Sequence, residues 1–281
     1  MFDSDKIKLD YQYGLFTSKG LEITFAVLDV EVDGLAETYF PRNGFSILNF
    51  FTQNYAIEFQ NYQGSRTIPY RFYLAGLFTN VALKVAHTGK GKGYAFKIHP
   101  VIAHHMLKTS MKNLVNKQVL LSKWLTDSKI LGQFENNGTL RYHEVGRMSI
   151  LFDILLPPKE VYQNDPMYHI VNFIASKKGK VTINDITSKF HITERTLHRN
   201  FTYKVGISFK SYAKIWQFEN ALKLMQVNPE ESLSSIAYKS GYYDMAHLAK
   251  DFQNYMDCAP KSLRHETSPM LKSYLDTQAI T

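Results

Sequence analysis

The chain has 281 residues, of which 44% are hydrophobic and 21% are charged. This composition is typical of a folded protein of about two domains, and it excludes a chain that is mainly disordered. Lysine and arginine number 33 against 25 aspartates and glutamates, so the net charge is +8. The excess favours an anionic partner, nucleic acid first, without proving one.

Cys258 is the single cysteine, which excludes an internal disulfide framework and a cysteine-rich zinc site. The first residues are polar and acidic and lack the apolar core of a secretory signal peptide. The most apolar stretch, Met148–Leu156, is interrupted by polar residues and is far shorter than the roughly 20 residues that cross a bilayer. We therefore expect a soluble cytoplasmic protein without a membrane partner.

The first hundred residues are predicted to be rich in β-strands. Short segments of β-branched and aromatic residues alternate with turn signals, a spacing typical of a small barrel or sandwich. The predicted strands are Leu21–Val32, Ser46–Phe51, Tyr55–Phe59, Arg71–Ala75 and Val81–Ala86, and the predicted turns are Asp33–Gly34, Pro41–Gly44, Asn61–Gly64 and Gly89–Gly93. Gly89–Gly93 lacks the spacing of a phosphate-binding P-loop, so we expect a mobile hairpin there.

From Pro100 the apolar period changes towards that of helices. A helix is predicted over Tyr142–Leu156, and the proline pair at 157–158 cannot continue it. We therefore expect an α+β protein with a β-barrel-like sensor or dimerisation domain and trailing helices over residues 1–156. A linker over 157–164 and an all-α domain over 165–281 should follow. The helices within 100–156 are candidate contacts of a homodimer.

The C-terminal domain shows clear helix start and stop signals. Helices are predicted to begin after the capping residues Thr182, Thr193, Ser208, Ser232 and Asp244. They are predicted to end near Gly206, Asn228–Pro229 and Gly241.

Two of these helices belong to an internal repeat. Leu197, Arg199 and Phe201 recur 51 positions later as Leu248, Lys250 and Phe252. A short helix precedes each set, so each copy has the outline of a helix-turn-helix, at about 182–204 and 232–256. Residues 176–225 hold ten basic and three acidic side chains, which concentrates positive charge at the first copy. A helical bundle with a solvated charged face is the alternative explanation.

The segment 167–264 resembles the DNA-binding domain of the AraC/XylS transcription regulators. Ile183–Phe201 matches the first motif of that family, Ser232–Phe252 matches the second, and Ala259–Arg264 resembles its closing segment. The resemblance implies two recognition helices joined by a long helix, which read successive major-groove segments of double-stranded DNA. It places base-reading positions at Arg195, His198 and Arg199 and, in the second motif, at Met245, Ala246, Ala249 and Lys250. Contacts with the DNA backbone are expected from Thr193, Lys204, Lys210, Lys239 and Lys261.

The second motif departs from a strong base reader. Methionine and alanine cannot hydrogen-bond base edges, although either can touch a thymine methyl group. We therefore expect most base specificity from the first motif. Gln217 stands where the family usually has arginine, and Asp257 stands where it usually has glycine.

A weaker resemblance covers the N-terminal domain. Phe40–Gly44, Leu74–Thr79 and Lys97–Pro100 are similar to the sensor-position domain of one AraC subgroup. This implies a compact β-barrel followed by helices, and it leaves the ligand open. The aromatic residues of this part could line an effector pocket, or they could simply fill a small barrel.

The expected function is that of a sequence-specific DNA-binding transcription regulator, responsive to an effector and more an activator than a repressor. One alternative is an interaction adaptor that has lost DNA binding. A second is a metal-dependent barrel enzyme, suggested only by His87, His99, His104 and His105. These histidines include no His-x-His pair, and His104 and His105 should point apart. We expect no catalytic residue, metal or cofactor.

Overall fold

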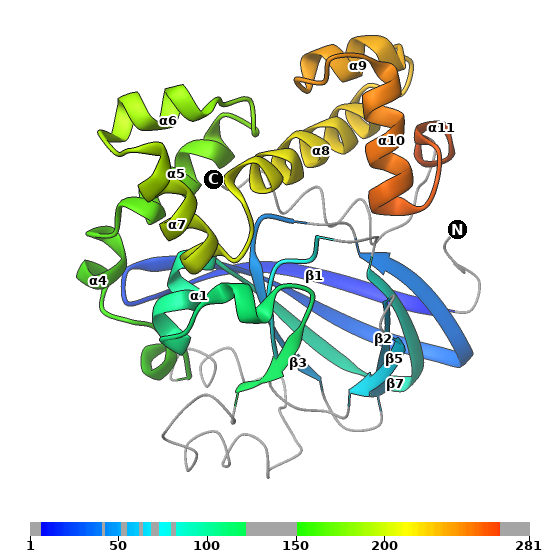
Figure 1. The fold of residues 1–281 in the computed structure, drawn as a ribbon. Helices are drawn as coiled ribbons and strands as arrows, with labels where there is room; N and C mark the ends of the chain where they lie inside the picture. The colour runs from blue at the N-terminus through cyan, green and yellow to red at the C-terminus, as the bar shows by residue number, and fades with distance from the viewer. Residues whose placement is uncertain are drawn as a thin grey trace.

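The computed structural model describes residues 7–40, 43–51, 55–61, 64–68, 73–79, 83–121 and 151–264. Strands fill the N-terminal part and helices the C-terminal part, which confirms the α+β prediction (Figure 1). Among the described residues, no helix combines the length and apolar character needed to cross a bilayer.

The described strands form one antiparallel sheet. Its main path runs β1 (Ile7–Ser18), β2 (Leu21–Phe40), β7 (Leu83–Ile98), β3 (Ser46–Phe51), β6 (Tyr73–Ala75) and β8 (Gln118–Leu120), and β4 (Tyr55–Asn61) pairs with β7 and with β5 (Gly64–Ile68). The long strand β7 pairs with β2 along one edge. Its other edge pairs first with β4 and then with β3. β7 is therefore the centre of the sheet.

Two of the predicted turns are wrong, because the chain stays extended there. Strand β2 continues past Asp33–Gly34, where the register with β7 shifts between Val32 and Leu35. Strand β7 continues through Gly89–Gly93, all of which is paired with β2. Glycines weaken a strand, but the flanking lysines form cross-strand ion pairs, Lys90–Glu31 at 3.3 Å and Lys92–Asp29 at 3.2 Å. Pairing with β2 thus overrides the local turn signal.

Strand β1 was not predicted, although its apolar residues alternate with polar ones. The remaining predicted strands coincide with described strands where the structure describes them. Residues 71–72 and 81–82 lie outside the described part, as do residues 142–150 of the predicted helix. Residues 151–155 are helical and end before Pro157, as predicted.

The sheet leads directly into the helix that meets the C-terminal region. Strand β7 ends at Ile98, and His99 then caps α1 (Pro100–Leu107) by accepting a hydrogen bond from the Val101 amide on its Nδ1, 3.2 Å away. Proline at the first helical position suits the start of a helix. The helix ends at Lys108 in the left-handed conformation, and a short 3-10 helix, η1 (Met111–Leu114), follows.

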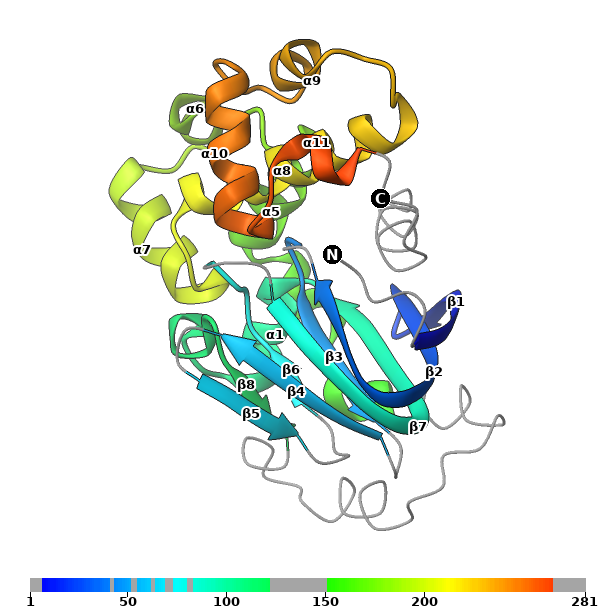
Figure 2. The same cartoon turned by 90° about the vertical axis from the view of Figure 1, so that its right-hand side faces the viewer.

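The C-terminal helices lie over one end of the sheet domain (Figure 2). They are α4 (Lys159–Gln163), α5 (Pro166–Ser176), α6 (Ile183–Phe190), α7 (Glu194–Val205), α8 (Phe209–Val227), α9 (Leu233–Lys239), α10 (Met245–Met256) and α11 (Pro260–Leu263). All five predicted capping residues cap their helices by accepting a backbone amide hydrogen bond. The segment expected as a linker contains α4, whose Tyr162 is buried against the sheet-domain core.

Two apolar clusters build the helical region around α8. One gathers α5, α6 and α7 on the first half of α8, with Ile186, Leu197 and Phe201 fully buried. The other gathers α9 and α10 on its second half, with Ile236, Leu248 and Phe252 fully buried. Equivalent positions of the repeat thus carry equivalent core residues. Leu77 and Val101 of the sheet domain belong to the first cluster, so the two regions share one continuous core there.

Candidate nucleic-acid interface

Each repeat copy folds as a helix, a turn and a second helix. In the first copy, the Thr182 hydroxyl accepts a hydrogen bond from the Asp185 amide, and Asp185 accepts one from the Thr182 amide. The turn passes through His191 in the left-handed conformation. Thr193 then caps α7 by accepting a hydrogen bond from the Thr196 amide. The two caps therefore fix where α6 and α7 begin.

The predicted base-reading side chains of α7 are exposed. Arg195, His198 and Arg199 project away from the core face that Leu197 and Phe201 occupy. Two of them make local polar contacts: His198 Nε2 lies 3.4 Å from Glu194, and Arg199 Nε lies 3.3 Å from the Asn200 side-chain oxygen. Bonds this long on exposed side chains hold them weakly. The three side chains are therefore available to an external partner.

The equivalent face of α10 is different in chemistry. Met245, Ala246 and Lys250 are exposed and Ala249 is half-buried. The surroundings add two large aromatic side chains, Tyr238 with 82% and Tyr243 with 91% of its surface exposed. Asp244 caps the helix by accepting a hydrogen bond from the His247 amide at 2.8 Å. The second motif thus presents mainly apolar groups where the first presents charged ones.

The predicted backbone-contacting residues fall into two groups. Lys210 and Lys261 are exposed at the starts of α8 and α11. Lys204 and Lys239 are engaged within the chain, with Nζ atoms 2.5 Å from carboxylate oxygens of Asp165 and Glu231. Hydrogen bonds from Lys239 and Ser235 hold the pKa of Glu231 below its usual value. The hydroxyl of Thr193, the fifth residue, caps α7.

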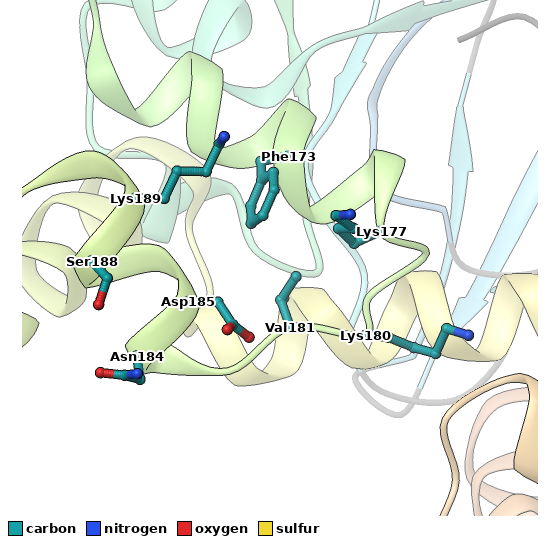
Figure 3. A pocket seen from close by; sticks show the side chains of 8 residues that line it. All are labelled: Phe173, Lys177, Lys180, Val181, Asn184, Asp185, Ser188 and Lys189. Atoms are coloured by element: carbon teal, nitrogen blue, oxygen red, sulfur yellow. The ribbon is translucent and has the colours of Figure 1, made fainter.

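A basic hollow beside α6 adds residues that motif reasoning did not single out (Figure 3). It has a volume of about 670 Å³ and is lined by Phe173, Lys177, Lys180, Val181, Asn184, Asp185, Ser188 and Lys189. The Nζ atoms of Lys177 and Lys189 lie 5.9 and 5.1 Å from the centroid of the Phe173 ring. The signal that could have found these lysines is the local excess of positive charge.

The two helix-turn-helix units also contact each other directly. Lys180 Nζ donates to the Lys239 carbonyl oxygen at 3.1 Å. Gly179 and Gly241 have φ angles of +74° and +84°, and a Cβ atom on either would lie within 3.3 Å of Gln217 on α8. Gln217, which departs from the family pattern, therefore packs between turns of both units. Asp257, the other departure, ends α10 with φ +51°, a conformation that suits glycine better.

The N-terminal domain contacts α7 through a polar cluster centred on Asp165. The Asp165 carboxylate is buried and caps α5 by accepting a hydrogen bond from the Met167 amide at 3.0 Å. Its Oδ2 atom accepts hydrogen bonds from Lys204 of α7 at 2.5 Å and from His105 of α1 at 2.9 Å. One carboxylate thus joins α1, α5 and α7.

His104 and His105 do not point apart as expected, because both contact the helical region. Their ring centroids lie 5.1 Å apart. The His104 ring meets the Tyr203 ring of α7 edge to face, with centroids 5.2 Å apart. Successive side chains of a helix point about 100° apart, but both histidine side chains are long enough to reach the same neighbouring surface of the helical region. Among the described residues, no group of three His, Cys, Asp or Glu side chains could hold a metal ion.

A second contact joins the sheet domain to α8. Tyr212 donates from its hydroxyl to the Gly44 carbonyl oxygen at 2.8 Å, and the Trp216 ring packs edge-on against Phe45. Lys97 Nζ lies 5.4 Å from the centroid of the same Phe45 ring. Burial lowers the pKa of Lys97 to about 8, although the charge of Glu219 on α8 opposes this shift. The sheet domain therefore contacts both the first recognition helix and the connecting helix.

Comparison with known proteins identifies the helical region. A family model described as a helix-turn-helix domain matches residues 186–266. This region is a helix-turn-helix domain. The chain is 28% identical over 93 residues to the HTH-type transcriptional activator RhaS of Citrobacter koseri, a match that covers 33% of this chain and 33% of that protein.

Two further similarities extend beyond the helix-turn-helix domain. The lactose operon transcription activator of Staphylococcus xylosus is 23% identical over 175 residues, covering 56% of this chain and 61% of that protein. The chain thus aligns with less than two thirds of the length of either relative. The structure of ToxT from Vibrio cholerae strain SCE256 superimposes with a TM-score of 0.49 and 16% identity, over 91% of this chain and 98% of that one.

Proposed function

We propose that the protein is a sequence-specific DNA-binding transcription regulator. The observation that carries this proposal is the repeated helix-turn-helix, with capped recognition helices α7 and α10 joined by α8. A recognition helix presents its N-terminal residues to base edges in the major groove. Activation is favoured over repression, since the relatives RhaS and the lactose operon protein are both named as activators.

The two motifs read DNA by different chemistry in this proposal. Arg195 and Arg199 form bidentate hydrogen bonds with guanine, and His198 supplies a further donor or acceptor. Met245, Ala246 and Ala249 contact thymine methyl groups, and Lys250 reaches a base edge or a phosphate. Lys210 and Lys261 contact phosphates, as does the exposed basic hollow beside α6.

The N-terminal domain regulates the helical domain in this proposal. Support comes from the contacts of α1 and the Gly44 turn with α7 and α8, which a ligand-driven change in the sheet domain would alter. A small-molecule effector of unknown identity acts on this domain. Helix α1 packs against α4, α5 and α7 and is largely buried, which leaves little of its surface for a homodimer contact.

Selection of bound duplexes from a random DNA pool, with the full chain at about physiological salt, tests the proposal. Enrichment of one motif with two half-sites about one helical turn apart is expected. Arg199→Ala serves as the paired variant and should relax the base preference at one position of one half-site only. Failure to enrich any sequence, with or without candidate effectors, would favour the interaction adaptor, whose best support is the apolar face of α10.

A further inference from the structure

A hollow of about 650 Å³ lies between the N-terminal domain and the first recognition helix. Ser110 and Lys112 line it from the N-terminal domain, and His198, Arg199 and Tyr203 are among its lining residues on α7. Two of the side chains predicted to read bases therefore share a surface with residues about ninety positions earlier in the sequence.

Close packing fixes the two sides of this hollow relative to each other. The Ser110 hydroxyl donates to the Tyr203 carbonyl oxygen at 3.4 Å. Gly206, which ends α7, lies so near η1 that a Cβ atom there would be 2.8 Å from the Met111 carbonyl oxygen. Only glycine allows this approach, and its φ of +99° also favours glycine. The start of η1 is thus held against the C-terminal half of α7.

Two cationic side chains, Lys112 and Arg199, line the hollow from its two sides. No acidic side chain lines it, and the nearest one to His198 is Glu194, 3.4 Å away on the same helix. Residues 99–121, which include α1 and η1, contain no aspartate or glutamate at all. Lys112 and Arg199 are exposed. A polyanion approaching α7 at this hollow would therefore meet one cationic side chain from each domain.

We propose that the N-terminal domain takes part in DNA binding through this hollow, with Lys112 contacting the phosphate backbone beside the first half-site. The inference rests on the function proposed above. If Arg199 and His198 face base edges, the strand that borders the major groove passes next to them, and duplex DNA carries one charge per about 1.7 Å. The Ser110 hydroxyl can donate to the same backbone, as hydroxyls commonly do in DNA complexes.

The salt dependence of binding by the full chain tests this proposal. Lys112→Ala should reduce the slope of log K against log salt by about 1 and weaken binding about fivefold at 0.15 M salt. The loss should be equal on cognate and random duplexes, because phosphates carry no base identity. Lys90→Ala is the matched control: this exposed lysine lies on β7, paired with Glu31, about eight residues before the strand reaches α1.

Phosphate ethylation interference locates the contact. The wild-type protein should be blocked by ethylation of phosphates flanking the first half-site, and Lys112→Ala should lose sensitivity at those phosphates alone. An unchanged salt slope, or tighter binding by Lys112→Ala, would overturn the inference while leaving the proposed function intact. Absence of any sequence-specific binding by the wild-type chain would overturn both.

Discussion

Lys204, in the last turn of α7, donates a hydrogen bond to Asp165, the residue that caps α5, across 2.5 Å. The same carboxylate oxygen accepts from His105 on α1. Although burial raises the pKa of Asp165, the hydrogen bonds from Lys204, the Met167 amide and His105 together hold that pKa below its usual value. Asp165 therefore connects the first recognition helix to His105 of the N-terminal domain.

Asp165→Asn tests this connection. Asparagine can still cap α5, but it cannot form the ion pair, so we expect a loss of about 2 kcal/mol in the free energy of unfolding at pH 7. Because the folded-state pKa is lowered, the stabilisation is present above the unfolded-state pKa and is lost as pH falls through the folded-state pKa. Urea titrations should show a constant difference between the two proteins from pH 7 to about pH 5, and a difference that shrinks as pH falls below the ordinary aspartate pKa of about 3.9. A difference that stays constant down to about pH 2 would contradict the ion pair.

Lys204 and Lys210 should respond differently to substitution, although both were predicted to contact the DNA backbone. Lys204 is occupied by Asp165, whereas Lys210 is exposed at the start of α8. We expect Lys210→Ala to lower the salt slope of DNA binding by about 1 and Lys204→Ala to leave it nearly unchanged. Fluorescence anisotropy over a series of salt concentrations measures both slopes. Equal reductions would mean that Lys204 exchanges Asp165 for a phosphate when DNA binds.

Arg199→Ala should affect recognition of a base rather than general affinity. Loss of a bidentate contact with guanine costs about 1–3 kcal/mol at the cognate site and relaxes the preference at that position. Competition binding against duplexes with each base at that position measures both effects. Equal losses on cognate and random DNA would assign Arg199 to the phosphates instead.

Met245 should make the second half-site sensitive to thymine methyl groups. Replacing a contacted thymine by uracil removes one methyl group and should weaken binding about fourfold. The same replacement in the first half-site should have little effect, because α7 reads mainly through polar groups. The Met245→Ala variant should bind duplexes with thymine or with uracil at one position of the second half-site with nearly equal affinity. Equal uracil sensitivity in both half-sites would argue against apolar reading by α10.

His99 should make the folded state sensitive to mild acid. Burial lowers its pKa from 6.5 to about 3, and its Nδ1 must stay unprotonated to accept from the Val101 amide. Between pH 6.5 and pH 3 the unfolded chain binds more protons than the folded chain, so the free energy of unfolding falls as pH decreases, by on the order of 5 kcal/mol in total. His99→Asn keeps a capping oxygen and removes the titration. Its unfolding free energy should therefore change less between pH 7 and pH 4, as measured by urea unfolding.

The helix boundaries of the C-terminal region could be predicted because their causes are local. A hydroxyl or carboxylate at Thr182, Ser208 or Asp244 satisfies amides within three residues, and the sequence shows this directly. The turn prediction at Gly89–Gly93 failed because pairing with β2, more than fifty residues earlier, decides the conformation there. Local glycine content carries no information about that partner.

The exposed residues of α7 could be predicted from the sequence, whereas the residues that pack around them could not. Arg195 and Arg199 follow from the repeat and from the buried positions of Leu197 and Phe201. The engagement of Lys204 by Asp165, and the placement of Lys112 and Arg199 on two sides of one hollow, depend on how distant segments pack. Such contacts between distant segments leave no periodic signal in the chain.

The packing of Gln217 between the turns at Gly179 and Gly241 bears on the spacing of the two DNA half-sites. Helix α8 has 19 residues and is about 28 Å long. Together with the packing of Gln217, it fixes the distance between the two recognition helices. Inserting a single base pair between the half-sites rotates one by about 34° and moves it about 3.4 Å along the DNA axis. Promoters under this protein's control should therefore tolerate base changes within a half-site far better than any change in spacing.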